Sequence, residues 1–417
     1  MRALSGLNRL IGFGLSMAAL AAAALVAIPW MVRASGPEAF GMIVLGQNFG
    51  AIGAMVVAYG WGIAGPAEIA RGTTESRLAE FLASVKVRVF LLGPVAVLTA
   101  AAAMLLATGR VDLAAVGAVV AVLPGLTSNW VFIGLGRPFV LMLTETLPRV
   151  AFTVVGIVAM ETGSDALIGL IWQGVGLLVA FVASSWWVLR AFDYRHVGLA
   201  ALPPLRTLLR DYRHGVASNV GSSLFVALPL VLVTVVAPAA QPVFALVDKL
   251  ERQALVALVP VVSVLQGWVP RAADPASRAR KVVIGASIGS VLIALVAGLW
   301  GQWPLHVLGD GQLTPSADVV ALMGVVLGLS FYVIALAHTV LATYREMRAL
   351  AMSTFIGTVV MIPLVVVGAY YLGAAGALAG IAGGLLVRMS IKLVVTSRCL
   401  QGPPPVNDMV LPSEEIV

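Results

Sequence analysis

Long apolar stretches recur along this chain, each close to the roughly 20 residues that an α-helix needs to cross a bilayer. Lipid offers the backbone no hydrogen-bond partners, so stretches of this length are expected to fold as helices. Of the 417 residues, 60% are hydrophobic and only 11% are charged, a balance that is not typical of soluble domains. The sequence therefore predicts an all-α integral membrane protein with twelve transmembrane helices. These are Ile11–Met31, Phe40–Ala64, Val87–Ala107, Leu113–Ile133, Phe139–Met160, Ala166–Val188, Val216–Val236, Val243–Leu265, Val282–Trp300, Ala317–Thr339, Leu350–Leu372 and Ala375–Val395.

The basic residues indicate the topology, because loops on the cytoplasmic side of a membrane are rich in Lys and Arg. If the N-terminus is cytoplasmic, nearly all of the 26 Lys and Arg residues fall at the two ends of the chain or in every second loop. The connections on the other side are short and neutral or acidic, as at 161–165 and 237–242. We therefore expect both termini to lie in the cytoplasm. The basic residues outside this distribution are Arg33, Arg110, Lys249 and Arg252.

The spacing of landmark residues indicates an internal repeat. Phe40 opens the second apolar stretch as Phe244 opens the eighth, and Pro66 and Pro270 close these two stretches at the same spacing. Because each half has an even number of helices, six, both halves lie in the membrane with the same orientation. This is the arrangement of parallel repeats. We expect two six-helix lobes around a central cavity. The predicted divisions are an N-terminal lobe (1–188), a cytoplasmic linker (189–215), a C-terminal lobe (216–395) and a cytoplasmic tail (396–417).

The eighth apolar stretch carries four ionisable residues, Asp248, Lys249, Glu251 and Arg252. Charged groups in hydrocarbon are costly, and they normally face a bundle interior or a watery cavity. One interpretation is that Lys249 and Arg252 line a cavity and meet an anionic substrate, with Asp248 and Glu251 pairing with them or exchanging a proton. The other is that the four charges pair with one another and only hold helices together. Arg33, at the outer end of the first helix, is a further candidate for the cavity.

Sequence motifs for common enzymatic chemistry are missing. The chain has no Walker A loop and no Gly-x-Ser-x-Gly, HExxH or CxxC pattern. Its four histidines have no metal-ligand spacing, and its one cysteine, Cys399, cannot form an internal disulfide. The net charge of +7 is explained by topology and does not indicate nucleic-acid binding. We expect no enzyme activity, no cofactor and no metal.

Residues 33–71 resemble the start of bacterial polysaccharide flippases of the Wzx type. In that family a Gly-Pro-Glu-x-(Phe/Tyr)-Gly segment opens the second helix, and a Gly-(Phe/Trp) pair precedes a step into a basic loop. A second element, Trp-x-(Phe/Tyr)-x-Gly-(Leu/Met), ends the fourth helix. The matching residues are Pro37, Glu38, Phe40, Gly41, Gly60, Trp61, Pro66, Ile69, Ala70 and Arg71, and then Trp130, Phe132, Gly134 and Leu135.

The resemblance implies a MATE-like exporter of the multidrug/oligosaccharidyl-lipid/polysaccharide (MOP) superfamily in the bacterial cytoplasmic (inner) membrane. Such a protein moves a lipid-linked oligosaccharide of the polyprenyl-pyrophosphate type across the membrane by alternating access, for surface polysaccharide biosynthesis. Its partners would be this substrate, membrane lipids, and the polymerase or glycosyltransferases of the same pathway. The family has no invariant catalytic motif, so the candidate residues Lys249 and Arg252 depend on the charge argument alone.

Four alternatives stay open from the sequence; one of them, a purely structural membrane scaffold, gives no reason for the charges at 248–252. A drug or metabolite antiporter of the same architecture predicts a cavity dominated by acidic residues, whereas acids and cations are equal in number in the eighth stretch. A flippase for peptidoglycan precursors would share the fold and the lipid-linked cargo. A membrane glycosyltransferase or ligase would need catalytic acids on the outer side, and the short outer loops argue against it.

Overall fold

The computed structural model describes residues 2–192, 202–269, 274–344 and 346–401, and within these ranges it contains helices and no strands. Short irregular turns separate the helices. The 3₁₀ turns are η1 (Leu123–Leu126) and η5 (Pro238–Ala240), and the π-helical turns are η2 (Met142–Thr146) and η6 (Ala337–Leu341). The α-helices are α1 (Arg2–Ser35), α2 (Pro37–Ala58), α3 (Trp61–Arg71), α4 (Thr74–Leu106), α5 (Val111–Val122), α6 (Asn129–Leu135), α7 (Pro138–Leu141), α8 (Leu147–Glu161), α9 (Ala166–Ala191), α10 (Leu205–Val236), α11 (Gln241–Trp268), α12 (Pro275–Trp300), α13 (Gln302–Leu308), α14 (Ala317–Leu336) and α15 (Met347–Gln401).

Within the described ranges, nine helices are long and apolar enough to cross a membrane. The last of them, Arg348–Gln401, contains two predicted helices joined at Gly373, whose positive φ of 59° breaks the helical backbone. The two other predicted helices lie on α10, whose apolar part is Val226–Val236, and on α11, which carries the four charges. The expected all-α, multi-pass membrane fold is confirmed.

The second predicted helix is broken within its span. The second helix was expected to run from Phe40 to Ala64, but α2 ends at Ala58 and α3 begins at Trp61. Tyr59 and Gly60 both adopt positive φ, at 46° and 86°, and this left-handed pair turns the chain. Glycine reaches this backbone conformation without steric cost, which explains the break at this position.

The chain divides into two compact units. Unit 1 comprises Met1–Gln253, Gln302–Ser316 and Ala369–Ala374; unit 2 comprises Ala254–Gly301, Ala317–Gly368 and Ala375–Val417. The division falls inside α11, so the helix that carries the four charges contributes them to unit 1. The predicted lobes and their linker stay a prediction, and residues 193–201 of the linker and 402–417 of the tail lie outside the described residues.

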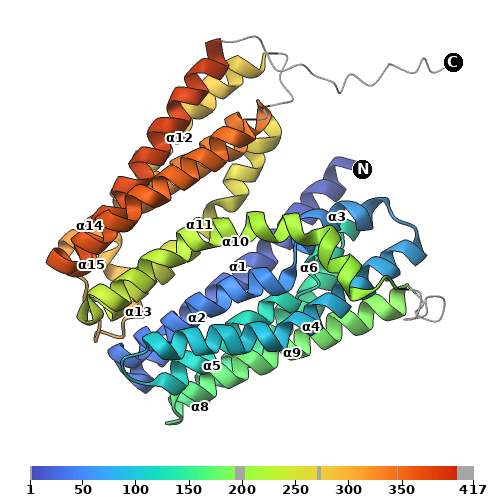
Figure 1. Ribbon diagram of the computed structural model, residues 1–417, viewed down its shortest axis with the longest axis horizontal. Helices are drawn as coiled ribbons and strands as arrows, with labels where there is room; N and C mark the ends of the chain where they lie inside the picture. The colour runs from blue at the N-terminus through green and yellow to red at the C-terminus, as the bar shows by residue number, and fades with distance from the viewer. Residues whose placement is uncertain (1, 193–201, 270–273, 345, 402–417) are drawn as a thin grey trace. The chain divides into compact units, whose positions relative to one another are not determined.

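In unit 1, α2 is the most enclosed helix and packs against α4, α5 and α10 (Figure 1). Glycines make the close contact with α5 possible. A Cβ atom on Gly46 would overlap the carbonyl oxygen of Ala114, and one on Gly50 would overlap that of Ala118. Small residues are typical of such contacts between membrane helices, because they let two backbones approach.

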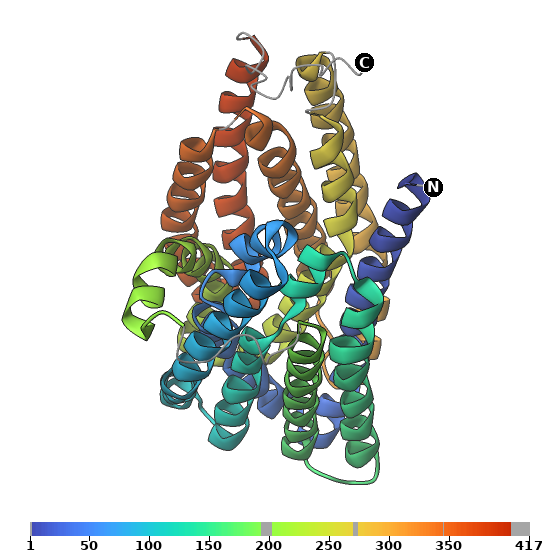
Figure 2. The ribbon, with the colours of Figure 1, turned by 90° about the vertical axis from the view of Figure 1, so that its right-hand side faces the viewer.

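Helices α8 and α9 form an antiparallel pair, joined at one end by a short connection (Figure 2). The chain enters α8 through α7 and the π-helical turn η2, which places one more residue in the turn than an α-helix does. Asp165 caps α9 by accepting a hydrogen bond of 2.8 Å from the Leu167 amide. This pair supplies one wall of the cavity described below.

Five of the fourteen residues that resemble the flippase motif lie in or against one buried cluster of unit 1: Trp61, Ile69, Trp130, Phe132 and Leu135. Trp61 and Trp130 are both almost fully buried. Arg88 lies beside both rings, with its Cζ 5.8 Å and 5.5 Å from their centroids, and donates to the Thr127 carbonyl at 2.9 Å. The Trp61 indole donates to Glu80 at 2.7 Å. These contacts give the motif residues a packing role in holding α3, α4 and α6 together.

In unit 2, α12 packs closely against α14. Gly324 and Gly328 face the backbone of α12, where an added Cβ would come within 2.5 Å of the carbonyl oxygens of Ala294 and Ser290. Lys392, on the second half of α15, is buried and donates to the Val333 carbonyl at 3.1 Å. Unit 2 is therefore tightly packed through small residues in the same way as unit 1.

Candidate functional site: a cationic cavity in unit 1

A cavity of about 150 Å³ lies within unit 1, between α1, α2, α8, α9 and the first half of α11. One part of its wall is apolar and comes mainly from α1. The other part carries amide, hydroxyl and cationic side chains. A space of this size holds several waters or a phosphate-sized group. The lining residues are Leu20, Ala23, Ala24, Ile28, Met31, Phe40, Gln47, Arg149, Thr153, Gln173, Leu177, Lys249 and Gln253.

Lys249 is the candidate residue that the structure places at this cavity. It lies on α11, is half-buried, and its Nζ donates a hydrogen bond to Gln47 Oε1 on α2 at 2.5 Å. An ammonium group has three donors. This is the one hydrogen bond of its side chain to a described residue, so donors remain for a ligand in the cavity.

Arg149 supplies a second cation to the same cavity, from α8. Its guanidinium forms no hydrogen bond or ion pair with any residue in the described part of the chain. The nearest opposite charge acting on it is Glu145, one turn earlier, which also acts on Arg88. Glu145 is only 2% exposed and accepts a hydrogen bond of 2.5 Å from the Ser128 amide. One carboxylate thus faces two guanidinium groups, which leaves the cavity side positive.

Arg252 and Asp248 do not line this cavity; they form a pair that joins three helices. Arg252 Nε donates to Asp248 Oδ2 at 2.8 Å, an i,i+4 ion pair along α11. Arg252 Nη2 donates to Asn48 Oδ1 on α2 and to the Val226 carbonyl on α10, both at 3.0 Å. Asn48 is buried and donates in turn to the Ala227 carbonyl at 2.8 Å. Bonds of this kind are what the second interpretation of the sequence, in which the charges hold helices together, predicts for Arg252.

Glu251 and Arg33 are also placed away from the lining of the cavity. Glu251 is half-buried and makes no hydrogen bond or ion pair with a described residue. Arg33, at the end of α1, donates two hydrogen bonds to Asp310, from Nε to Oδ2 at 2.9 Å and from Nη2 to Oδ1 at 2.6 Å. The hydrogen bond from Arg33 holds the pKa of Asp310 below its ordinary value. The contact ties α1 to the segment that follows α13, within unit 1.

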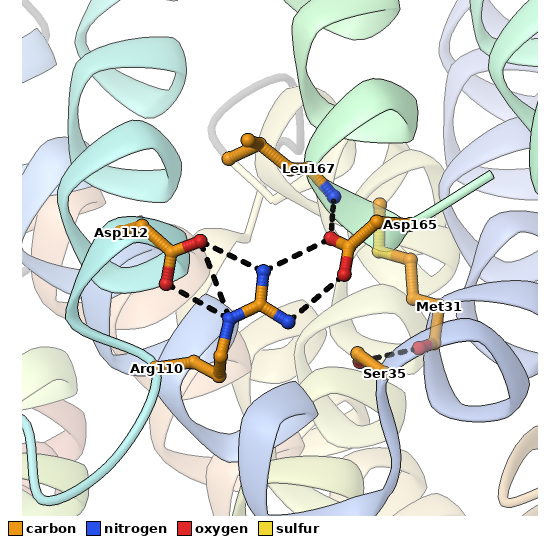
Figure 3. A network of polar contacts seen from close by, with 6 residues as sticks. All are labelled: Met31, Ser35, Arg110, Asp112, Asp165 and Leu167. Carbon is orange, nitrogen blue, oxygen red and sulfur yellow. Dashed lines mark hydrogen bonds and ion pairs between the residues drawn. The ribbon is translucent and has the colours of Figure 1, made fainter.

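Arg110, the remaining basic residue outside the cytoplasmic pattern, links the starts of α5 and α9. Figure 3 shows its guanidinium between the carboxylates of Asp112 and Asp165. Its Nη2 lies 2.7 Å from Asp112 Oδ2, and its Nη1 lies 2.9 Å from Asp165 Oδ2. The hydrogen bond from Arg110 holds the pKa of Asp165 below its ordinary value. This network fixes the helix ends, and its three charged side chains are substantially exposed.

The distribution of basic residues in the sequence places Arg149 with those of a cytoplasmic loop, whereas in the structure it lines the cavity. A signal was present, because Arg149 lies well inside the apolar stretch Phe139–Met160, where a charge is a candidate functional residue by default. Three glutamines also line the cavity, and nothing in the sequence marks them as functional: Gln47, Gln173 and Gln253. Uncharged polar residues are common in membrane helices, and only the packing of five helices brings these three together.

Among the described residues, no group of three or more His, Cys, Asp or Glu could hold a metal ion. No protein-family model matches the sequence. No curated protein matches it either. The comparisons with solved structures are therefore the ones that place the chain among known proteins.

Several solved structures share the fold over nearly the whole chain. An inward-facing multidrug resistance MATE family transporter of the MOP superfamily has a TM-score of 0.71 and 16% identity, covering 92% of this chain and 94% of that one. An outward-facing one has a TM-score of 0.59 and 14% identity, covering 94% and 95%. A MOP superfamily transporter from Pyrococcus furiosus, described by the reverse polarity of its binding pocket, has a TM-score of 0.57 and 14% identity, covering 95% and 96%. The chain thus has the all-helical membrane fold of the MATE transporters of the MOP superfamily.

Proposed function

We propose that this protein is a transporter that flips a lipid-linked oligosaccharide of the polyprenyl-pyrophosphate type across the cytoplasmic membrane, by alternating access, for surface polysaccharide biosynthesis. The observation that carries the proposal is the pair of cations, Lys249 and Arg149, in the cavity of unit 1. The resemblance of residues 33–71 to Wzx-type flippases supports the identity of the cargo.

The chemistry of the cavity suits the anionic end of such a cargo. A pyrophosphate cannot cross hydrocarbon unaided, and cations in a polar cavity compensate its charge. An arginine can bind two phosphate oxygens side by side, and a lysine acts as a compact point charge beside it. The amides of Gln47, Gln173 and Gln253 add neutral hydrogen-bond donors. The cavity holds a phosphate-sized group and not a whole glycan, so the proposal concerns the charged linkage.

The competing function is efflux of cationic drugs or metabolites, which the fold likeness to multidrug transporters also allows. A cationic cargo needs carboxylates in its pocket, and the lining residues among those that the structure describes include none. The Pyrococcus transporter, whose description links reversed pocket polarity to a different function, is a precedent for polarity separating functions on this fold. The positive cavity therefore favours an anionic cargo.

The decisive experiment replaces both cations, as Lys249→Gln with Arg149→Gln, in a strain that lacks the chromosomal copy. We expect surface polysaccharide to fall at least tenfold, because each cation contacts the phosphates directly. Proteoliposomes made with the double variant should lose flipping of a fluorescent polyprenyl-pyrophosphate saccharide to the same extent.

The matched control is Arg71→Gln with Arg206→Gln, which removes the same charge from two exposed positions away from the cavity. Its flipping rate should stay within twofold of the wild type. Full rescue of surface polysaccharide by the Lys249/Arg149 variant would refute the site. Efflux of a lipophilic cation by the wild-type protein, without flipping of the saccharide lipid, would refute the cargo.

A further inference from the structure

Two arginines are held against adjacent tryptophans at the C-terminal end of α9. The Cζ of Arg190, in the last turn of α9, lies 5.2 Å from the ring centroid of Trp186. The Cζ of Arg137, which precedes α7, lies 5.4 Å from the ring centroid of Trp187. Both distances are within the range of a cation–π interaction. Two guanidinium groups are thus fixed over neighbouring positions of one helix end.

A cation–π contact uses the face of the ring and leaves the N–H donors of the guanidinium available. The guanidinium groups of Arg137 and Arg190 form no hydrogen bond or ion pair with another residue in the ranges that the structure describes. Both side chains are exposed, and the Trp186 ring is 58% exposed. The two arginines therefore present most of their donors outward, in orientations that the rings have already fixed.

Apolar side chains continue along the same two helices from this point. Phe139, Leu143 and Leu147, which follow Arg137, are all more than half exposed. Val182, one turn before Trp186 on α9, is exposed as well. In a multi-pass membrane protein, exposed apolar residues contact acyl chains. The two arginines could contact a charged headgroup, and the exposed apolar side chains beside them could contact acyl chains. This combination is typical of a lipid-binding surface.

We propose that Arg137, Arg190, Trp186 and Trp187 bind an anionic phospholipid of the cytoplasmic leaflet, with its phosphodiester oxygens on the two guanidinium groups and its acyl chains along α7 to α9. Arginine matches phosphate oxygens bidentately, which gives bonds stronger than those to a neutral headgroup. Tryptophan is favoured at the level of the headgroups, where one part of its ring is apolar and the other polar. The topology derived from the sequence places this end of α9 on the cytoplasmic side.

The test measures lipid retention by native mass spectrometry of the full chain, purified into nanodiscs that contain phosphatidylcholine with a minor fraction of phosphatidylglycerol or cardiolipin. The variant is Arg137→Gln with Arg190→Gln. A basic residue near an anionic surface is worth a factor of about five, so we expect retention of anionic lipid to fall at least tenfold in the double variant. Retention of phosphatidylcholine should not change.

The control, Arg71→Gln with Arg206→Gln, removes the same charge from exposed arginines that stack on no aromatic ring among the described residues. It should retain anionic lipid within twofold of the wild type. Equal losses in the two double variants would overturn the proposal, since general surface charge would then explain the binding.

Trp186→Leu keeps every charge and removes one ring, and we expect about a threefold loss of anionic lipid. Unchanged retention in this variant would show that the stacked geometry is not the site. An excess of inorganic phosphate should leave the bound lipid in place, whereas displacement would assign the site to free phosphate. All four side chains concerned lie at least partly exposed, so the variants should elute as the wild type does on size exclusion.

Discussion

Lys249 and Arg252 are one helical turn apart, yet the structure predicts opposite effects when each is replaced by glutamine. Arg252 makes three hydrogen bonds of 2.8–3.0 Å, to Asp248, Asn48 and the Val226 carbonyl. Side-chain hydrogen bonds between membrane helices are worth about 0.6 kcal/mol each on average. Arg252→Gln should therefore lower the free energy of unfolding by about 2 kcal/mol, and more if Asp248 is left without its partner. Lys249→Gln loses one bond and should cost about 0.6 kcal/mol.

The assay has two readouts for each variant. Reversible unfolding in mixed micelles gives the free energy of unfolding, and flipping of the saccharide lipid in proteoliposomes gives the activity of the folded fraction. We expect Arg252→Gln to be unstable but active per folded molecule, and Lys249→Gln to be stable but at least tenfold less active. The reasoning is refuted if Lys249→Gln is the more destabilised variant, or if Arg252→Gln abolishes flipping at unchanged stability.

Two further predictions concern the scaffold of unit 1. Because the hydrogen bond from Arg110 lowers the pKa of Asp165, this carboxylate should stabilise the fold at neutral pH and lose that effect as the pH falls below about 4. Asp165→Asn should thus unfold at a lower temperature than the wild type at pH 7, with a difference that narrows progressively as the pH falls below about 4; a constant difference would contradict the prediction. Gly46→Ala should destabilise the protein by about 1–3 kcal/mol, because the new Cβ would overlap the Ala114 carbonyl oxygen and push α2 from α5. Gly62→Ala is the control, since its Cβ would meet no atom within 4 Å, and equal losses of stability in the two variants would contradict the packing argument.

The sequence was sufficient to place charged residues on α11 but not to separate their roles. What separates Lys249 from Arg252 is the partner that each finds on α2, where the consecutive residues Gln47 and Asn48 accept their hydrogen bonds. Which residues of two helices face each other depends on the packing angle and the register of the pair. The periodicity of one helix does not predict either of these. For the same reason Arg149 was counted with a basic loop, although it lies in an apolar stretch.

The positions of the nine long apolar spans among the described residues followed from hydrophobic length, because every backbone polar group in lipid needs a hydrogen-bond partner whatever the side chains are. The interruptions within helices did not follow from it. Proline and glycine are common in membrane helices, so Gly60 and Gly373 did not stand out from glycines that remain helical. Length therefore predicts spans well and predicts breaks within them poorly.

The π-helical turn Met142–Thr146 has a consequence for the angular phase of α8. A turn of this kind holds one residue more than an α-turn, so the helix beyond it is advanced by about 100° relative to an uninterrupted helix. Arg149 comes three residues after the turn ends and faces the cavity in that advanced phase. Shortening the turn by one residue would leave the composition of the span nearly unchanged. It would nevertheless swing the guanidinium onto a different side of the helix, away from Lys249, so the position of this cation depends on a single residue of extra length.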